Sequence, residues 1–409
     1  MMKDILFLAH RIPYPPDRGD KIRSWNMLKF LAGLGRVHLA CFADDANDAA
    51  YLDDVRAKLG GNLGETHVEL RSTSQISAAV RALGSGSPVS VSLFASPGLG
   101  RFVSRLLEDE RVGTVFAFSG QMAQFVPARL RQRFIMDFVD MDSAKYAAYA
   151  RDGAGPMAWV HAREAEKLLA FERATALRAD LSLFVSKAEA DVFRARARLP
   201  DVDIRVIQNG IDLGFYDPAA HFPRLAPFPG PLIVFTGQMN YRPNIEAVLG
   251  FAREAFPAIR KACPGAVFAV VGRKPTDAVR QLQQRPGIVV TGAVDDVRSW
   301  LAAADVVVAP LRIARGVQNK VLEAMAMARP VVASPQAFEG IEAAAGRDLV
   351  VADGAAAEAA AVIGLLADRT RAAELGRAAR ARMARAYRWE ARLAPLTRIL
   401  GAPLREAAA

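Results

Sequence analysis

Residues 306–326 of this 409-residue chain read VVVAPLRIARGVQNKVLEAMA, a pattern that predicts a strand, a loop and a helix in succession. It opens with a valine run typical of a strand buried on both faces. It closes with a helical pattern that starts near Gln318 or Asn319, after a loop that contains Gly316. Free backbone N–H groups and the positive end of a helix dipole then lie just beyond a strand, and together they favour binding of a phosphate.

The side chains of the same stretch suit a nucleoside diphosphate. Arg315 and Lys320 add positive charge, and a guanidinium can hold two phosphate oxygens at once. Glu323 lies about one turn into the helix, where a carboxylate can accept hydrogen bonds from two adjacent ribose hydroxyls. The alternative is that Glu323 is a surface or capping acid and that Arg315 is solvated or paired with a nearby acid. The combined segment favours the nucleotide interpretation.

Short runs rich in Val, Ile, Leu and Phe alternate with helical patterns along the chain, which predicts two doubly wound α/β domains with parallel sheets. Five prolines within residues 218–231 mark a linker between the domains. The expected domains are residues 1–220 and 230–385, with 386–409 returning to the first domain as a terminal helix. The expected strands are Ile5–His10, Val37–Phe42, Thr66–Leu70, Val115–Ser119, Phe134–Val139, Leu181–Ser186, Ile204–Gln208, Leu232–Thr236, Val267–Val271, Ile288–Thr291, Val306–Pro310, Val331–Ala333 and Leu349–Ala352.

Composition and missing motifs exclude several classes of protein. Hydrophobic residues make up 52% and charged residues 23%, which is normal for a packed protein and argues against disorder. No apolar run is long enough to span a bilayer, and the N-terminus lacks the features of a signal peptide, so we expect a cytoplasmic protein. The two cysteines form no metal-ligand pattern. No phosphate-binding Gly-Lys-Ser/Thr loop, dinucleotide-binding Gly-x-Gly-x-x-Gly or Gly-x-Ser-x-Gly elbow stands where it would be needed.

The net charge of +10 is concentrated near the C-terminus, where Arg371 to Arg405 includes nine arginines against two glutamates. A basic helical surface can bind an anionic membrane, so we expect a peripheral location on the inner face of the plasma membrane as one option. The alternative is an ordinary solvated helix face. No nucleic-acid-binding motif accompanies the charge, so no nucleic-acid partner is expected.

Several short motifs occur in an order that resembles glycosyltransferase family 4, whose members are retaining sugar transferases of GT-B fold. A finer resemblance is to the sugar transferases of exopolysaccharide and PEP-CTERM systems. The resemblance implies two Rossmann-like domains facing across a cleft, the first for the acceptor and the second for the nucleotide-sugar donor. The motifs are Pro13–Arg23, Val185–Asp191, Asn209–Asp212, Phe235–Gly237, Val270–Gly272, Thr291–Asp296 and Leu322–Ala326.

The resemblance also implies roles for individual positions. Gly19 and Gly237 follow the first strand of each domain and would let the backbone approach donor phosphate or sugar. Val294 and its neighbours would offer main-chain groups to the base, and Glu323 would bind the ribose. The backbone of Asn319–Val321 would meet the diphosphate. No cofactor and no metal ion are expected beyond the nucleotide sugar itself.

Departures from the family pattern suggest a different set of cations. The family commonly has two glutamates eight positions apart, but Arg315 stands where the first would be. We hypothesise that Arg315, with Lys320 and Arg273, neutralises the leaving diphosphate in the transition state. The family's histidine after a strand of the first domain is also missing, and Ser119 or Gln121 stands there instead.

Asp140-Met141-Asp142-Ser143 follows a predicted strand and is the other notable polar cluster. One interpretation gives Asp140 a role in acceptor binding or proton removal. A second is the metal-binding Asp-x-Asp of single-domain transferases, which the two-domain pattern disfavours. A third is helix capping by Asp142 or Ser143.

The sequence therefore predicts a retaining, metal-independent glycosyltransferase that uses a nucleoside-diphosphate sugar and a saccharide or polyprenyl-linked acceptor. A nucleotide-sugar-binding scaffold without turnover and a GT-B sugar-nucleotide epimerase stay open as alternatives.

Overall fold

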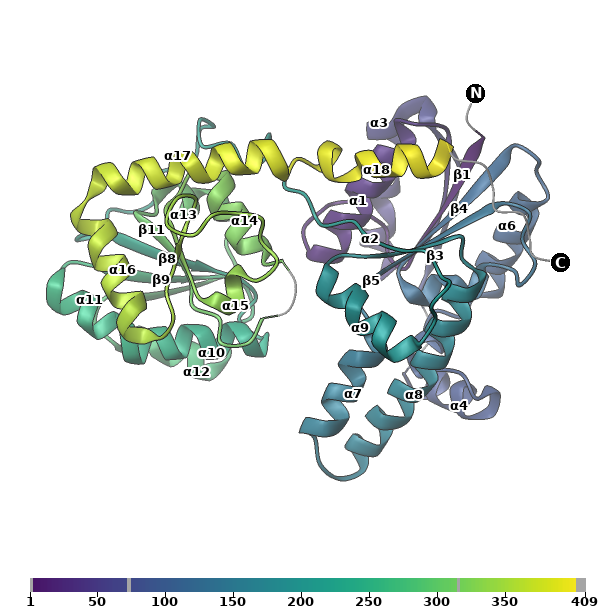
Figure 1. The fold of residues 1–409 in the computed structure, drawn as a ribbon, viewed down its shortest axis with the longest axis horizontal. Coiled ribbons are helices and arrows are strands. Elements are labelled where there is room, and N and C mark those ends of the chain that lie inside the picture. Colours follow the sequence, from purple (N-terminus) through teal and green to yellow (C-terminus); the bar gives the residue numbers. More distant parts are fainter. Residues whose placement is uncertain (1–2, 72–74, 315–316, 402–409) are drawn as a thin grey trace. The chain divides into compact units, whose positions relative to one another are not determined.

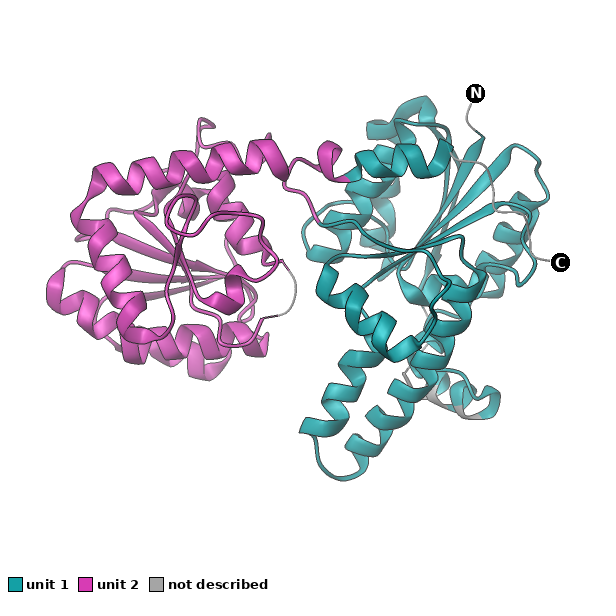
Figure 2. Cartoon of the chain, viewed as in Figure 1, with its two compact units in different colours: residues 1–208, 393–409 teal, residues 209–392 magenta. Residues whose placement is uncertain are grey.

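A computed structural model describes residues 3–71, 75–314 and 317–401 of the chain. They form two compact units, which Figures 1 and 2 show. Unit 1 comprises residues 1–208 and 393–409, and unit 2 comprises residues 209–392. Each unit is an α/β domain with its own parallel sheet and its own hydrophobic core.

Unit 1 contains a seven-stranded sheet in the order β3-β2-β1-β4-β5-β6-β7. Its strands are β1 (Asp4–Ala9), β2 (Val37–Ala43), β3 (Leu63–Leu70), β4 (Val112–Phe118), β5 (Arg133–Val139), β6 (Leu181–Phe184) and β7 (Ile204–Val206). Its helices are α1 (Gly19–Ala32), α2 (Ala46–Ala50), α3 (Leu52–Leu59), η1 (Gly60–Asn62), α4 (Gln75–Ser85), α5 (Val89–Ser92), α6 (Pro97–Leu107), η2 (Gly120–Phe125), α7 (Asp142–Asp152), α8 (Gly155–Arg178) and α9 (Lys187–Ala197).

The inner strands of unit 1, β1, β2, β4, β5 and β6, are buried on both faces because helices cover each side, whereas β3 and β7 are only partly buried. Leu6 and Leu8 of β1 pack in one cluster with Leu99 and Val103 of α6. The intervening side chain of Phe7 points to the opposite face, since successive strand residues alternate. This double burial explains why β2 is hydrophobic with little alternation along its whole length, as the sequence pattern predicted.

Unit 2 contains a six-stranded sheet in the order β10-β9-β8-β11-β12-β13. Its strands are β8 (Leu232–Thr236), β9 (Val267–Val271), β10 (Ile288–Gly292), β11 (Val306–Ala309), β12 (Val331–Ala333) and β13 (Val350–Val351). Its helices are α10 (Arg242–Gly250), η3 (Phe251–Ala255), α11 (Phe256–Ala262), α12 (Asp277–Arg280), η4 (Gln281–Gln284), α13 (Val297–Ala303), α14 (Asn319–Ala326), α15 (Pro335–Phe338), α16 (Ala355–Ala367) and α17 (Arg369–Ala386), and α18 (Trp389–Gly401) then returns the chain to unit 1.

Every strand expected from the sequence is present, and every pairing between the named strands is parallel. In each sheet the strand order reverses at one point, between β1 and β4 in unit 1 and between β8 and β11 in unit 2. Open α/β sheets bind ligands beyond the carboxyl ends of the strands at such a point. The loops that follow these four strands are therefore where a site is expected.

The boundaries of the units differ from those expected, because residues 209–220 and 386–392 belong to unit 2. The amide of Ile211 donates to the carbonyl of Tyr387 at 2.7 Å, and both side chains are buried in the core of unit 2. After residue 392, the chain packs on unit 1. There Arg133 of β5 donates to the carbonyls of Ile399 and Leu400 at 2.6 and 2.7 Å.

Candidate functional site

Two glycines bring the loops after β8 and β9 of unit 2 into direct backbone contact. A Cβ added to Gly272 would lie 1.7 Å from the carbonyl oxygen of Gly237, so no larger residue fits there. A Cβ on Gly237 would lie 2.7 Å from the side-chain nitrogen of Asn244 and 3.3 Å from Nζ of Lys320. The predicted position Gly237 therefore lies beside the predicted cation Lys320, and a larger residue there would displace the Asn244 side chain.

Lys320, the second residue of α14, points into a confined polar position. Its Nζ donates to the side-chain oxygen of Asn244 and lies 4.3 Å from the centre of the Phe235 ring. The Asn244 amide nitrogen in turn donates to the carbonyl of Gln238 at 2.9 Å. Burial lowers the pKa of Lys320 to about 7, although the carboxylate of Glu323 acts in the opposite direction. An ammonium in such a position gains from any anion that reaches it.

Glu323 lies on the same helix, one turn beyond Lys320, and it has a partner that sequence reasoning missed. The hydroxyl of Tyr216 donates to its carboxylate. Burial raises the pKa of Glu323, which the hydrogen bond from Tyr216 and the charge of Lys320 partly offset. Tyr216 comes from a segment more than 100 positions earlier in the chain, where no local pattern signals its role.

Two arginines hold the segment that carries Tyr216. Arg380 of α17 donates to the carbonyls of Leu213 and Tyr216, and also to that of Ala326 at the end of α14. Arg298 donates to the Phe215 carbonyl at 2.9 Å and stacks 3.8 Å from the centre of its ring. Tyr216 is thus fixed relative to the helix that presents Glu323.

The N-terminal tip of α14 is only partly described, because Arg315 and Gly316 lie outside the described residues. Asn319 is the first helical residue. The amide of Val321 donates to the carbonyl of Gln318 at 3.0 Å, and the Val321 side chain is fully buried. The Val321 amide therefore has a partner within the helix turn, and the expectation that the backbone of Asn319–Val321 meets a diphosphate stays a prediction.

Two further predicted donor residues lie in neighbouring loops of unit 2, whereas Gly19 is the first residue of α1 in unit 1. Arg273 follows β9, where its side chain is exposed and its carbonyl accepts from Met239 at 3.0 Å. Val294 follows β10, half-buried against the core of unit 2. Both residues come after strands of one sheet at its carboxyl edge.

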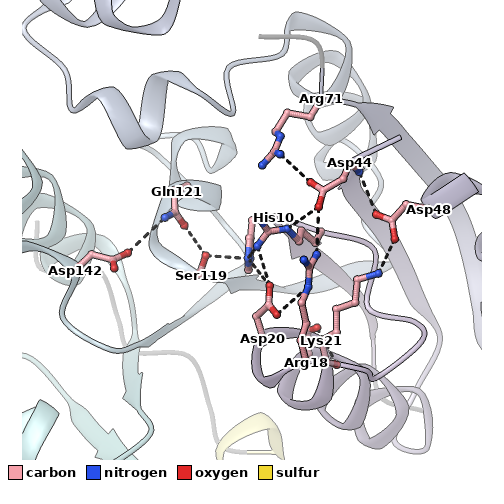
Figure 3. Close-up of polar contacts among 12 residues, drawn as sticks. His10, Arg18, Asp20, Lys21, Asp44, Asp48, Arg71, Ser119, Gln121 and Asp142 are labelled. Atoms are coloured by element: carbon pink, nitrogen blue, oxygen red, sulfur yellow. Dashed lines mark hydrogen bonds and ion pairs between the residues drawn. The ribbon is translucent and has the colours of Figure 1, made fainter. Parts of the chain in front are cut away.

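A chain of polar contacts crosses the carboxyl edge of the sheet in unit 1 (Figure 3). His10, which follows β1, contacts Oγ of Ser119 through Nδ1 at 3.1 Å and Asp20 through Nε2 at 3.3 Å. Ser119 also donates to Gln121, whose amide donates to Asp142 at 3.4 Å. The imidazole of the residue that follows β1 thus lies against the position after β4 where the resemblance led us to expect a histidine.

Asp140 lies at a solvent-accessible position after β5. The surrounding protein restricts hydration of its carboxyl group, and together with the nearby charges of Glu189 and Asp142 this raises its pKa to about 6. The capping alternative for Asp142 and Ser143 is wrong, because Met141 precedes the helix and neither side chain caps it. The Ser143 amide and hydroxyl instead donate to Glu172 of α8.

Within residues 3–71, 75–314 and 317–401, no group of three or more His, Cys, Asp or Glu side chains could hold a metal ion. In the same ranges, no helix is long and apolar enough to cross a membrane.

The basic C-terminal helices carry fewer unengaged arginines than their charge suggests. Arg382 donates to the carbonyl of Glu342, and Arg392 donates to its carboxylate at 2.9 Å. Arg380 binds the three carbonyls described above. Part of the local charge therefore stabilises unit 2.

Comparison with known proteins bears on both fold and family. Residues 230–368 match the family model "Glycosyl transferases group 1". No curated protein matches the sequence significantly. Among solved structures, the chain is similar to Anabaena HepE in complex with UDP and glucose, with a TM-score of 0.66, 15% identity and coverage of 97% of this chain and 99% of that one.

Two further structures show the same likeness. Sucrose-phosphate synthase from Thermosynechococcus elongatus gives a TM-score of 0.67 at 17% identity and covers 97% of this chain and 98% of that one. WaaG, a glycosyltransferase involved in lipopolysaccharide biosynthesis, gives 0.66 at 14% identity and covers 97% and 100%. The chain therefore has the GT-B fold, and most of its second unit matches the group 1 glycosyl transferases.

Proposed function

We propose that this protein is a glycosyltransferase that transfers a sugar from a nucleoside-diphosphate donor, with retention of configuration and without a metal ion. One observation carries the proposal: α14 presents Lys320 and Glu323 one turn apart, next to the point where the strand order of unit 2 reverses. A cation and a carboxylate at this spacing match the diphosphate and the ribose of one nucleotide. The family match over residues 230–368 includes both residues.

Glu323 binds the ribose in this proposal. Its carboxylate has two oxygens with about four acceptor positions, and Tyr216 occupies one of them. The remaining positions can accept hydrogen bonds from the two ribose hydroxyls. Tyr216 keeps the carboxylate in one orientation, so the ribose meets a preorganised acceptor.

Lys320 binds the diphosphate. In the free protein, burial makes the ammonium unfavourable and Asn244 is its hydrogen-bonded partner. A diphosphate nearby favours the charged form and draws a proton onto Nζ. As the sugar leaves, negative charge grows on the diphosphate, and a fixed ammonium stabilises that charge more in the transition state than in the ground state.

Arg315 and Arg273 supplement this charge from the loops before α14 and after β9. A guanidinium can bind two phosphate oxygens at once, which an ammonium cannot do. We expect Arg315→Ala to weaken nucleoside-diphosphate binding and to slow turnover. Unchanged donor affinity and unchanged turnover in this variant would remove Arg315 from the proposal.

Unit 1 binds the acceptor, a saccharide or polyprenyl-linked saccharide of a cell-surface glycan or exopolysaccharide. Asp140 accepts a hydrogen bond from the attacking hydroxyl. With a pKa of about 6, its carboxyl group is ionised at neutral pH yet more basic than an ordinary aspartate.

The protein acts at the cytoplasmic face of the plasma membrane in this proposal. The exposed arginines Arg377, Arg385 and Arg388 of the C-terminal segment supply the charge that an anionic surface attracts. Sedimentation with vesicles that contain an anionic lipid, compared with neutral vesicles, tests this location.

The activity is tested with a panel of nucleotide sugars, with and without candidate acceptors and with excess chelator. We expect release of nucleoside diphosphate that survives chelation, and a product whose anomeric configuration equals that of the donor. Glu323→Gln should raise the donor KM. Donor binding without turnover across the whole panel would support a scaffold instead, and interconversion of donors would support an epimerase.

A further inference from the structure

Unit 1 holds three arginines around two carboxylates, a group that we call the arginine cluster: Arg11, Arg18, Arg71, Asp20 and Asp44. Figure 3 labels all of them except Arg11. Asp44 contacts all three guanidinium groups, at 3.3 Å from Arg11, 3.3 Å from Arg18 and 3.1 Å from Arg71. Asp20 contacts Arg11 at 2.9 Å and Arg18 at 3.3 Å.

The cluster lies at the carboxyl edge of the sheet, beside its switch point. Arg11 follows β1, Asp44 follows β2 and Arg71 follows β3, while Arg18 immediately precedes α1. Residues that are distant in the sequence meet here because the carboxyl ends of parallel strands lie at one edge. This is the edge at which doubly wound sheets bind ligands.

The cluster carries more positive than negative charge. Three guanidinium groups face two carboxylates, and the neighbouring Lys21 does not change the balance because Asp48 binds it at 2.6 Å. Burial acts to raise the pKa of Asp44, but Arg11, Arg71 and Arg18 outweigh this effect and lower it. The five residues of the cluster therefore carry one net positive charge even with both carboxylates ionised.

If the cluster served only to stabilise the fold, three guanidinium groups would not be expected around one carboxylate, because their like charges repel one another. Each guanidinium has five N–H donors, so the two carboxylates cannot use the donors of all three. The repulsion between the arginines is relieved when a further anion arrives. The side chains of Arg11, Arg18 and Arg71 are 26%, 29% and 34% exposed, so an anion can reach them in a partly desolvated setting.

The start of α1 supports the same conclusion. This helix of 14 residues has Arg18 at its N-cap position and no side-chain cap, and its first residue is Gly19. A Cβ added to Gly19 would meet nothing within 4 Å. Packing among the described residues therefore does not require a glycine there, whereas close approach of a ligand to the backbone would.

We propose that the arginine cluster binds the phosphate or diphosphate group of the acceptor, which makes the acceptor a phosphate-bearing compound rather than a neutral sugar. This inference rests on the proposed function, in which Lys320 of unit 2 binds the diphosphate of the donor. The arginine cluster of unit 1 is then a second set of cations, and the phosphate group of the acceptor is the anion that it binds. The diphosphate of the donor offers the same chemistry, so the experiment distinguishes binding of the acceptor from binding of the donor.

Calorimetric titration with inorganic pyrophosphate tests the cluster without knowledge of the acceptor. The chain with Lys320→Ala, which weakens the donor site, should still bind pyrophosphate. Adding Arg71→Gln should reduce that affinity about tenfold, the effect of losing one charge-assisted hydrogen-bond donor. The matched control Arg111→Gln removes the same charge from an exposed pair with Asp109 in the same unit and should leave the affinity unchanged.

Two results would overturn the proposal: loss of all pyrophosphate binding in Lys320→Ala alone, or equal effects of Arg71→Gln and Arg111→Gln. Arg71→Lys keeps the charge and should retain most of the affinity, which separates ligand binding from damage to the fold. Thermal unfolding of each variant checks that unit 1 is intact.

A transfer assay distinguishes this proposal from the proposed function. With prenyl diphosphate-linked and neutral alkyl-linked saccharides as acceptors, Arg71→Gln should raise KM only for the diphosphate-bearing acceptor and leave the donor KM unchanged. A raised donor KM would assign the cluster to the donor and refute the inference. If no donor is turned over, the proposed function fails, whereas the pyrophosphate titration still decides whether the cluster binds phosphate.

Discussion

Lys320 should make unit 2 less stable at neutral pH than at alkaline pH, and replacing it should remove that dependence. Burial lowers its pKa from 10.5 to about 7 in the folded protein. In the unfolded chain the lysine keeps its ordinary pKa. Between these two values the unfolded state binds the extra proton, so the free energy of unfolding rises with pH.

The magnitude follows from the two pKa values. From pH 7 to pH 9 the folded protein releases the proton of Lys320 while the unfolded chain retains it. Each pH unit over which the proton numbers of the two states differ by one changes the free energy of unfolding by about 1.36 kcal/mol. Near pH 7 the folded protein has released only part of the Lys320 proton, so the free energy of unfolding of the wild type rises by about 2 kcal/mol relative to that of Lys320→Met. Other titrating groups are common to both proteins and cancel in this difference. The Asn244 oxygen that loses its donor lowers the stability of the variant by a similar amount at both pH values.

Urea unfolding at pH 7 and pH 9 measures the effect. Replacing Trp25 and Trp159 by Phe leaves Trp300 and Trp389, so the fluorescence reports on unit 2 alone. Lys261→Met, at an exposed position of α11, is the matched control and should show no pH-dependent gap. If the difference in stability between the wild type and Lys320→Met is equal at both pH values, the claim that burial lowers the pKa of Lys320 is refuted.

Four further substitutions have defined outcomes. Tyr216→Phe should weaken binding of a nucleoside diphosphate by about tenfold, because Glu323 loses the donor that orients it; equal affinities in calorimetry would contradict this. Gly272→Ala should destabilise unit 2 by at least about 2 kcal/mol, since its Cβ would overlap a carbonyl, whereas Gly19→Ala should leave the melting temperature unchanged. Asp140→Asn should stabilise unit 1 at pH 7 but not at pH 4, because a raised carboxyl pKa makes the folded state lose stability as pH rises through about 6; the same gain at both pH values would refute that cause.

The strands and the two-unit organisation could be predicted because they depend on local composition. Valine-rich runs such as Val306–Ala309 are buried on both faces, so their hydrophobicity carries the signal without any knowledge of their neighbours. The linker could be predicted because prolines prevent regular structure. The unit boundary at residue 208 could not be predicted, because it depends on the pairing of Ile211 with Tyr387, which are far apart in the chain.

Individual side chains were harder to predict because their roles depend on distant partners. Arg23 ends the motif Pro13–Arg23, where nothing in the sequence distinguishes it from a solvated basic residue, yet it is buried and binds Asp137 through two nitrogens at 2.9 and 3.1 Å. Tyr216 gave no signal at all, although it donates to a carboxylate that the sequence did single out. The sequence alone does not show whether a charged or polar side chain faces solvent, a ligand or the core.

Because Arg133 donates to the carbonyls of Ile399 and Leu400, unit 1 is completed only when the last residues of the chain have been translated. The main part of unit 1 leaves the ribosome first, but the chain returns to unit 1 only at residue 393, within α18 and after all of unit 2. At a translation rate of about 5–20 residues per second, roughly 10–40 s pass between synthesis of the sheet of unit 1 and synthesis of the segment that covers the Arg133 side chain. During that interval the nascent chain exposes a surface that the finished protein buries, and chaperones have their opportunity to bind it.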